Sequence, residues 1–128
     1  MPVRLLNSPV LKWPDAQTVV QALRRWAEKV SQDRPEVVRI GYFGSYARGD
    51  WGVGSDLDLL IIVSDSDQPF ELRPSGFNPL ELPVPTDVLV YTLAEWHAMT
   101  PARRFFQELD REAVWVYTRN IKLHEVSP

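Results

Sequence analysis

Residues 44–63 read GSYARGDWGVGSDLDLLIIV, and this stretch decides the fold. It joins a glycine-serine turn to two aspartates that are separated by one residue and that open an apolar run. Alternate side chains of a β-strand lie on the same face of its sheet. We therefore expect a strand from Asp56 to Val63, with Asp56 and Asp58 projecting together at its mouth and Leu59 to Val63 buried.

The paired carboxylates predict a bound cation. Two carboxylates held side by side repel and raise each other's pKa unless a cation lies between them. Hard oxygen ligands favour Mg²⁺, which proteins hold through one or two carboxylates and the phosphates of a substrate. The Gly44-Ser45 turn offers backbone N–H groups, the Ser45 hydroxyl and a helical dipole end for those phosphates. Arg48 lies on the same turn, where its charge can neutralise a triphosphate.

Length and composition predict one globular domain that covers residues 1–128. The chain has 128 residues, of which 45% are hydrophobic and 24% charged, which argues against disorder of its bulk. Its net charge of -3 disfavours nucleic acid as the main partner. The absence of cysteine excludes a disulfide framework and a thiolate metal site. With neither a signal peptide nor a membrane-spanning stretch in sight, we expect a cytoplasmic protein without a membrane partner.

The first half of the chain predicts an arm, a helix and two strands. Residues 1–14, with three prolines, are expected to form a loose arm. Asp15 is a candidate cap for a helix that runs to about Ser31. A strand over residues 37–43 leads into the Gly-Ser turn, which continues as a short helical turn to about Gly49, and residues 50–55 form a loop before the second strand. The helix shows a clean apolar stripe, made of Val19, Val20, Leu23, Trp26, Ala27 and Val30.

The second half predicts a long loop followed by two strands with helices between them. Residues 64–85 are rich in proline and lack periodicity, so we expect a loop there. A third strand covers residues 86–91, Thr92 caps a helix to about Met99, and a further helix begins at Pro101 and reaches about Asp110. A fourth strand over residues 113–117 precedes a polar tail, 119–128. The expected fold class is α/β (α+β), a small mixed sheet of about four strands flanked by helices.

Asp87 is the candidate third carboxylate. It lies at the entrance of the apolar strand that begins at Thr86, whereas Asp65 and Asp67 follow the second strand too closely and Asp110 falls in a predicted helix. Three carboxylates from two adjacent strands can hold two metal ions, which stabilise the attacking and leaving oxygens of an in-line phosphoryl displacement. Asp87, touching one metal only, would help to deprotonate the attacking hydroxyl.

Several other residues have a functional and a structural interpretation. Trp51 in the loop could stack on a base, but packing is the favoured role. His97 and His124 lack partners at ligand spacing and are expected to be surface histidines or histidines whose hydrogen bonds are satisfied within the fold. The sequence Arg103-Arg104-Phe105-Phe106 could touch nucleic acid, although such helices more often bury their aromatics and solvate their arginines. Three further tryptophans are expected in the core, namely Trp26, Trp96 and Trp115.

The pattern Gly44-Ser45, ten residues, Asp56-x-Asp58 and a later strand-opening aspartate resembles the DNA polymerase β-type nucleotidyltransferase superfamily. Its local form, Gly-Ser-x-Ala-Arg-Gly followed by Ser-Asp-x-Asp-Leu, is similar to the minimal nucleotidyltransferases (MNT), many of which are antitoxins of HEPN toxins. The resemblance covers residues 37–63 strongly and extends to Asp87 moderately. Two features depart from it: residues 64–85 form a loop where many relatives place a helix, and Val88 follows the third aspartate where relatives often have leucine.

This resemblance implies transfer of a nucleoside monophosphate, AMP from ATP, to a hydroxyl with release of pyrophosphate. It implies Asp56, Asp58 and Asp87 as catalytic residues and ligands of two Mg²⁺ ions, and Gly44, Ser45 and Arg48 as nucleotide-binding residues. The implied acceptor is a tyrosine of a HEPN toxin. Two alternatives stay open: an antitoxin that covers its partner without catalysis, and a small-molecule nucleotidyltransferase that builds its substrate site at a homodimer interface.

Overall fold

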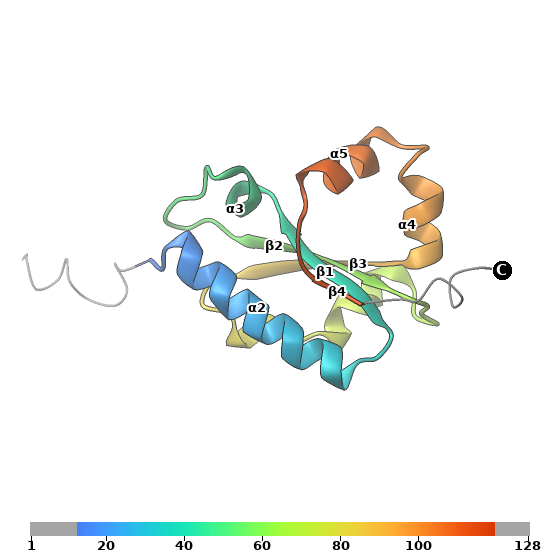
Figure 1. Cartoon of the computed structure of the whole chain (residues 1–128), viewed down its shortest axis with the longest axis horizontal. Coiled ribbons are helices and arrows are strands. Elements are labelled where there is room, and N and C mark those ends of the chain that lie inside the picture. The colour runs from blue at the N-terminus through green and yellow to red at the C-terminus, as the bar shows by residue number, and fades with distance from the viewer. Residues whose placement is uncertain (1–12, 120–128) are drawn as a thin grey trace, which may run out of the picture.

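The computed structural model describes residues 13–119, which form a mixed sheet with helices on both faces (Figure 1). Four strands lie in the order β3-β2-β1-β4. The central strands β1 and β2 are antiparallel, β4 is antiparallel to β1, and β3 is parallel to β2. The predicted fold class is therefore confirmed. In chain order the elements are α2 (Ala16–Asp33), β1 (Val37–Phe43), α3 (Ser45–Arg48), β2 (Leu57–Val63), η2 (Phe70–Gly76), η3 (Pro79–Glu81), β3 (Thr86–Thr92), α4 (Leu93–Met99), α5 (Arg104–Glu112) and β4 (Val114–Thr118).

The long helix α2 covers one face of the sheet. Its start is capped as predicted, with the Asp15 carboxylate accepting the Thr18 N–H at 2.8 Å. The helix ends at Asp33, two residues beyond the predicted end at Ser31. Its apolar stripe packs on the odd-numbered residues of β2 from Leu57 to Val63, all of which are buried. This contact forms the larger hydrophobic core.

The opposite face of the sheet is covered by α4 and α5 (Figure 1). Leu60 and Ile62 of β2 are fully buried there, against Trp96 of α4 and Phe106 of α5. Because side chains alternate along a strand, Asp58 lies on this same face, nearer the start of β2. The helix α4 begins at a capping box, in which the Thr92 side chain accepts the Glu95 N–H and the Glu95 carboxylate accepts the Thr92 N–H.

The segment 64–85 is more ordered than the sequence predicts. It contains two 3-10 helices, η2 and η3, and it buries Phe77, Leu82 and Val84 in the core beneath α2. The Trp26 indole of α2 donates a hydrogen bond of 2.8 Å to the Asn78 carbonyl and fastens the segment to the helix. Short 3-10 turns carry no amphipathic period of 3.6 residues, so a search for periodicity finds nothing in them.

Some predicted boundaries were wrong. The strand β2 begins at Leu57, so Asp56 precedes it instead of opening it. The helix α5 begins at Arg104 instead of Pro101, because the Ala102 and Arg103 N–H groups turn back to the Met99 carbonyl after α4. It ends at Glu112, two residues beyond the predicted end at Asp110. The strands β3 and β4 each end one residue later than predicted.

Both ends of the described chain are tied to the fold. Trp13, which the sequence places in a loose arm, donates its indole N–H to the Tyr46 hydroxyl at 3.1 Å. Arg119, predicted to begin a polar tail, pairs its backbone N–H with the Val38 carbonyl at 2.7 Å. The rest of the predicted arm and tail, including His124, lies outside the described residues. Between Trp13 and Arg119, the helices are too short or too polar to cross a lipid bilayer.

Candidate active site

Two of the predicted site carboxylates, Asp58 and Asp87, lie side by side on neighbouring strands. The parallel pairing of β2 with β3 sets Asp58 opposite Asp87, and side chains at paired positions lie on the same face of a sheet. The Leu57 N–H donates to the Pro85 carbonyl at 2.8 Å, which holds the start of β2 against the residue before β3. Asp58 is half-buried, whereas Asp87 and Asp56 are exposed. The geometry thus brings Asp58 and Asp87 together at the end of the sheet where β2 and β3 begin. We call this end of the sheet, with Asp56, Asp58 and Asp87, the carboxylate edge.

The charge environment of Asp58 is predominantly negative. Burial is the main cause that raises the pKa of Asp58, followed by repulsion from Asp87 and then from Asp56. The Arg48 guanidinium opposes this rise, and Glu112 adds a smaller repulsion. Asp56 and Asp87 therefore both repel the ionised form of Asp58. The sequence predicts such repulsion for the pair Asp56 and Asp58.

The Gly44-Ser45 turn lies directly beside Asp58. The antiparallel ladder pairs Phe43, the last residue of β1, with Asp58, so that Gly44 comes next to the carboxylate. Gly44 has φ +76° and ψ −150°, a conformation open only to glycine. A Cβ atom at this position would overlap the Asp58 carboxylate. The chain then forms α3, which includes Ser45 and ends at Gly49 in the left-handed conformation.

Two of the predicted phosphate-binding groups, the Arg48 guanidinium and the Gly44 N–H, are already bound to acidic side chains. The Arg48 guanidinium lies 3.2 Å from the Asp50 carboxylate and 3.4 Å from the Glu112 carboxylate. These two carboxylates raise the pKa of Arg48, so it is a stable cation. The Gly44 N–H, for its part, donates a hydrogen bond of 2.7 Å to Glu112. Both groups would have to exchange partners before they could hold a phosphate.

Glu112 is the residue of this site that the sequence reasoning missed. It is the last residue of α5, separated by 68 positions from Gly44, and no motif spacing connects the two. The strand β4 brings it there, because β4 begins at Val114 and pairs that residue with Tyr42 near the end of β1. Only a prediction that β4 lies beside β1 could have pointed to Glu112.

The loop between α3 and β2 carries an aromatic stack. The rings of Trp51 and Tyr46 are parallel, with an angle of 7° and centroids 5.7 Å apart. Trp13 bonds to the hydroxyl of Tyr46, so the stack ties the start of α2 to the Gly-Ser turn. In the same loop the Ser55 hydroxyl accepts the Gly52 N–H at 2.8 Å. Trp51 therefore has a packing partner within the chain, as the favoured interpretation requires.

The remaining candidates pack in the core or lie at the surface. Trp26 and Trp96 are buried and Trp115 is half-buried against Trp96, while His97 is exposed on α4. Phe106 is buried, but Phe105 is 54% exposed, so the aromatic pair of α5 is only half in the core.

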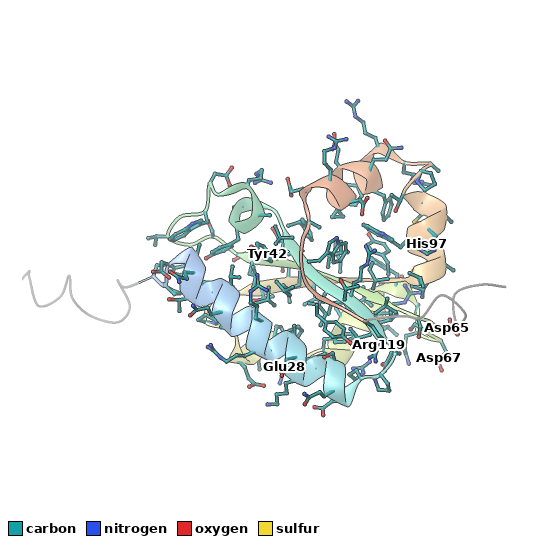
Figure 2. The ribbon with its side chains drawn as sticks, viewed as in Figure 1. Glu28, Tyr42, Asp65, Asp67, His97 and Arg119 are labelled. Atoms are coloured by element: carbon teal, nitrogen blue, oxygen red, sulfur yellow. The ribbon has the colours of Figure 1, made fainter. Side chains whose placement is uncertain are left out.

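Asp65 and Asp67 follow β2 at the far end of the sheet, where both are labelled in Figure 2. A cavity of about 430 Å³ lies beside them, lined in part by Arg34 and Arg73, and is separate from the carboxylate edge.

The donor set at the edge fits a divalent cation by its chemistry. Asp56, Asp58 and Asp87 supply oxygen ligands only, which Mg²⁺ prefers. The pKa of Asp58 is raised by burial first and then by repulsion from Asp87 and Asp56, and a cation would relieve the repulsion. Over residues 13–119, no three acidic or histidine side chains converge closely enough to form a ready-made metal cluster.

Family profiles identify the class of protein. The profile described as "Nucleotidyltransferase domain" matches residues 23–114, which is more than half of the chain. The chain therefore belongs to the nucleotidyltransferase domain family, in agreement with the motif. A search among curated proteins gives no match.

Solved structures with the same fold include a protein from Sulfolobus solfataricus that is assigned as a nucleotidyltransferase. The two chains superpose with a TM-score of 0.61 at 19% identity, over 81% of this chain and 84% of the other. A toxin-antitoxin structure with AMP-PNP gives a TM-score of 0.48 at 16% identity, over 75% of this chain and 73% of that one. A mutant of the toxin-antitoxin MntA-HpeT gives 0.46 at 14% identity, with the same coverage.

Proposed function

We propose that this protein is a Mg²⁺-dependent nucleotidyltransferase that transfers AMP from ATP to the hydroxyl of a tyrosine on a partner toxin of the HEPN type. The observation that carries the reaction type is the pairing of Asp58 with Asp87 beside Gly44, because it sets two carboxylates next to the Gly44-Ser45 turn. Membership of the nucleotidyltransferase family supports it. The acceptor and the partner rest on the resemblance of residues 44–58 to the MNT antitoxins.

In this proposal the three aspartates share the metal ions and the acceptor proton. Asp56, Asp58 and Asp87 would hold two Mg²⁺ ions, which supply charge neutralisation for an in-line phosphoryl displacement. The acceptor oxygen forms a bond to the α-phosphorus of ATP, the bond from that phosphorus to the β-phosphate oxygen breaks, and pyrophosphate leaves. Asp87 takes the proton of the acceptor hydroxyl, since it is the more exposed of the two paired carboxylates.

The Gly-Ser turn and Arg48 would hold the triphosphate. The Gly44 N–H and the Ser45 hydroxyl are hydrogen-bond donors, and charge-assisted bonds to phosphate oxygens are among the strongest that a protein makes. Arg48 adds a full positive charge on the same turn. We place the reaction in the cytoplasm, where ATP and Mg²⁺ are both abundant.

The test uses labelled nucleotide and two matched double variants. The protein is incubated with Mg²⁺, α-labelled ATP and a co-purified partner or a host lysate. The variant Asp56→Asn/Asp58→Asn should abolish labelling of the acceptor. Asp65→Asn/Asp67→Asn should leave it intact, because that pair has the same spacing but lies at the other end of β2. Stable binding of a partner without transfer of any nucleotide would overturn the enzyme proposal in favour of an antitoxin that acts by covering its toxin, and label on a small molecule would replace the protein acceptor.

A further inference from the structure

Glu112 holds two of the three groups that the proposed function assigns to the triphosphate, the Gly44 N–H and the Arg48 guanidinium. One carboxylate oxygen accepts the Gly44 N–H at 2.7 Å, and the other lies 3.4 Å from the Arg48 guanidinium. A carboxylate resembles one edge of a phosphate group, since both present two oxygens that share a negative charge. Glu112 thus satisfies the turn and the arginine as one edge of a phosphate would.

The position of Glu112 is unfavourable in other respects. It is the last residue of α5, where the partial negative charge of the helix end disfavours an acidic side chain. Its negative charge also adds to the charges of Asp56 and Asp87 around Asp58. Its side chain is nevertheless only 31% exposed. The hydrogen bond from Gly44 and the charge of Arg48 are the interactions that offset these costs.

The backbone makes this contact hard to avoid. Ala113 joins Glu112 to β4, and the pairing of Val114 with Tyr42 holds the start of β4 beside the end of β1. Gly44 follows β1 directly, so the acidic side chain reaches the turn from a fixed base. A ligand can displace the carboxylate by a change of side-chain rotamer, without a change in the sheet.

We propose that Glu112 is a specificity-determining residue that occupies the phosphate position of the Gly44-Ser45 turn and yields it only to a metal-bound polyphosphate. This inference rests on the proposed function, because it concerns the same site. A polyphosphate that carries Mg²⁺ brings several phosphate oxygens together with the cation that neutralises the four surrounding carboxylates. A nucleoside brings neither, and so it leaves Glu112 in place.

The negative charge of Glu112 should therefore weaken the binding of polyphosphate. Removing this charge should raise the affinity. Glu112→Gln keeps the size and one acceptor oxygen but loses the charge. We expect it to bind Mg²⁺-AMP-PNP and Mg²⁺-tripolyphosphate about tenfold more tightly than the wild type, because a charge-assisted bond no longer has to be broken first. The affinity for adenosine should stay unchanged. Glu108→Gln is the matched control, since Glu108 lies one turn earlier on α5 in an exposed pair with Arg104.

Titration calorimetry on the full chain measures these affinities, and ¹⁵N NMR adds a readout that does not depend on a ligand. The Gly44 amide resonance should move in Glu112→Gln before any nucleotide is added, and in the wild type only when Mg²⁺-AMP-PNP binds. If Glu112→Gln does not fold, Glu112→Asp shortens the side chain by one methylene and should give a smaller gain of the same sign.

The outcomes separate this inference from the proposed function. Tighter binding of both polyphosphates by Glu112→Gln supports it. If the wild type binds Mg²⁺-AMP-PNP and the variant binds it equally or more weakly, Glu112 is not a competitor of phosphate and this inference alone is overturned. If neither protein binds Mg²⁺-AMP-PNP, while both are folded, the inference and the proposed function are overturned together.

Discussion

The Asp58 carboxylate occupies the space that a Cβ atom at residue 44 would need, so that no side chain fits on Gly44. This contact joins the two halves of the motif in space: the Gly-Ser turn that follows β1 and the aspartate at the start of β2. The ladder between β1 and β2 produces it by pairing Phe43 with Asp58. Two features therefore require glycine at residue 44: the positive φ of its backbone and the neighbouring Asp58 carboxylate.

We predict that Gly44→Ala destabilises the fold by about 2–4 kcal/mol and abolishes transfer, because the new methyl group both strains the backbone and displaces Asp58. Urea denaturation measures the loss. Gly52→Ala is the control: it lies in the following loop without a positive φ, and a Cβ there meets no atom within 4 Å. Its effect should stay within about 0.5 kcal/mol. Equal stability of the two variants would show that the contact is unimportant.

We predict that Asp58→Asn stabilises the metal-free protein at neutral pH by up to about 1 kcal/mol while it abolishes transfer. Because the folded-state pKa of Asp58 is raised above its ordinary value of 3.8, its ionised form weakens the fold at every pH above the folded-state pKa. The gain should therefore shrink as the pH falls through the folded-state pKa and vanish only well below 3.8, where the wild-type carboxyl is protonated in both states. Denaturation curves in EDTA at several pH values measure it.

Mg²⁺ gives the complementary measurement. A cation that binds only the folded state should raise the melting temperature of the wild type and not that of Asp58→Asn. Asp67→Asn, an exposed residue beyond the other end of β2, should behave as the wild type in both respects. A wild type that Mg²⁺ leaves unchanged at millimolar concentration would argue against a metal site at Asp58.

The ion pair between Arg73 and Glu95 predicts a large structural effect far from the active site. The Arg73 side chain is only 9% exposed, and its two terminal nitrogens lie 2.7 and 3.1 Å from the two Glu95 oxygens. Glu95→Ala should cost about 3–4 kcal/mol, because it leaves this arginine unpaired and removes the capping box at Thr92. Glu108→Ala, which breaks the exposed pair with Arg104, should cost less than about 0.5 kcal/mol.

The same pair has a predictable pH dependence. The hydrogen bond from Arg73 is the main cause that lowers the pKa of Glu95 below its usual value of 4.5. Its stabilisation is therefore complete above that value and is lost as the pH falls through the lower folded-state pKa. The stability difference between the wild type and Glu95→Ala should shrink below pH 4.5. A constant difference down to pH 3 would contradict this account.

We predict that Trp51→Ala lowers stability by about 1–2 kcal/mol and leaves the affinity for Mg²⁺-ATP within threefold, because Trp51 already stacks on Tyr46. Calorimetry and thermal melting measure the two effects. Val53→Ala in the same loop is the control, since Val53 is 81% exposed and should change neither. A tenfold loss of affinity at unchanged stability would instead assign Trp51 to base stacking.

The sequence was most informative where apolar residues repeat with a clear period and capping residues mark the ends of helices. The apolar stripe and cap of α2, the alternating and apolar strands, and the Thr92 cap of α4 all specify local structure, and their elements were found with small errors at the ends. It was least informative over residues 64–85, where Phe77, Leu82 and Val84 are buried without a regular period. Their burial depends on contacts with α2, which lies some fifty residues earlier in the chain.

The sequence alone determined the fold class and the family, because the residues from Gly44 to Val63 combine a glycine that the backbone needs, two acids and a buried strand within one local stretch. The tertiary structure alone decided the partners of that stretch. It set Asp58 opposite Asp87 through the parallel register of β2 and β3, and it brought Glu112 onto the Gly44 N–H through the pairing of β4 with β1. Strand order and register depend on contacts between distant segments, and local patterns carry no record of them.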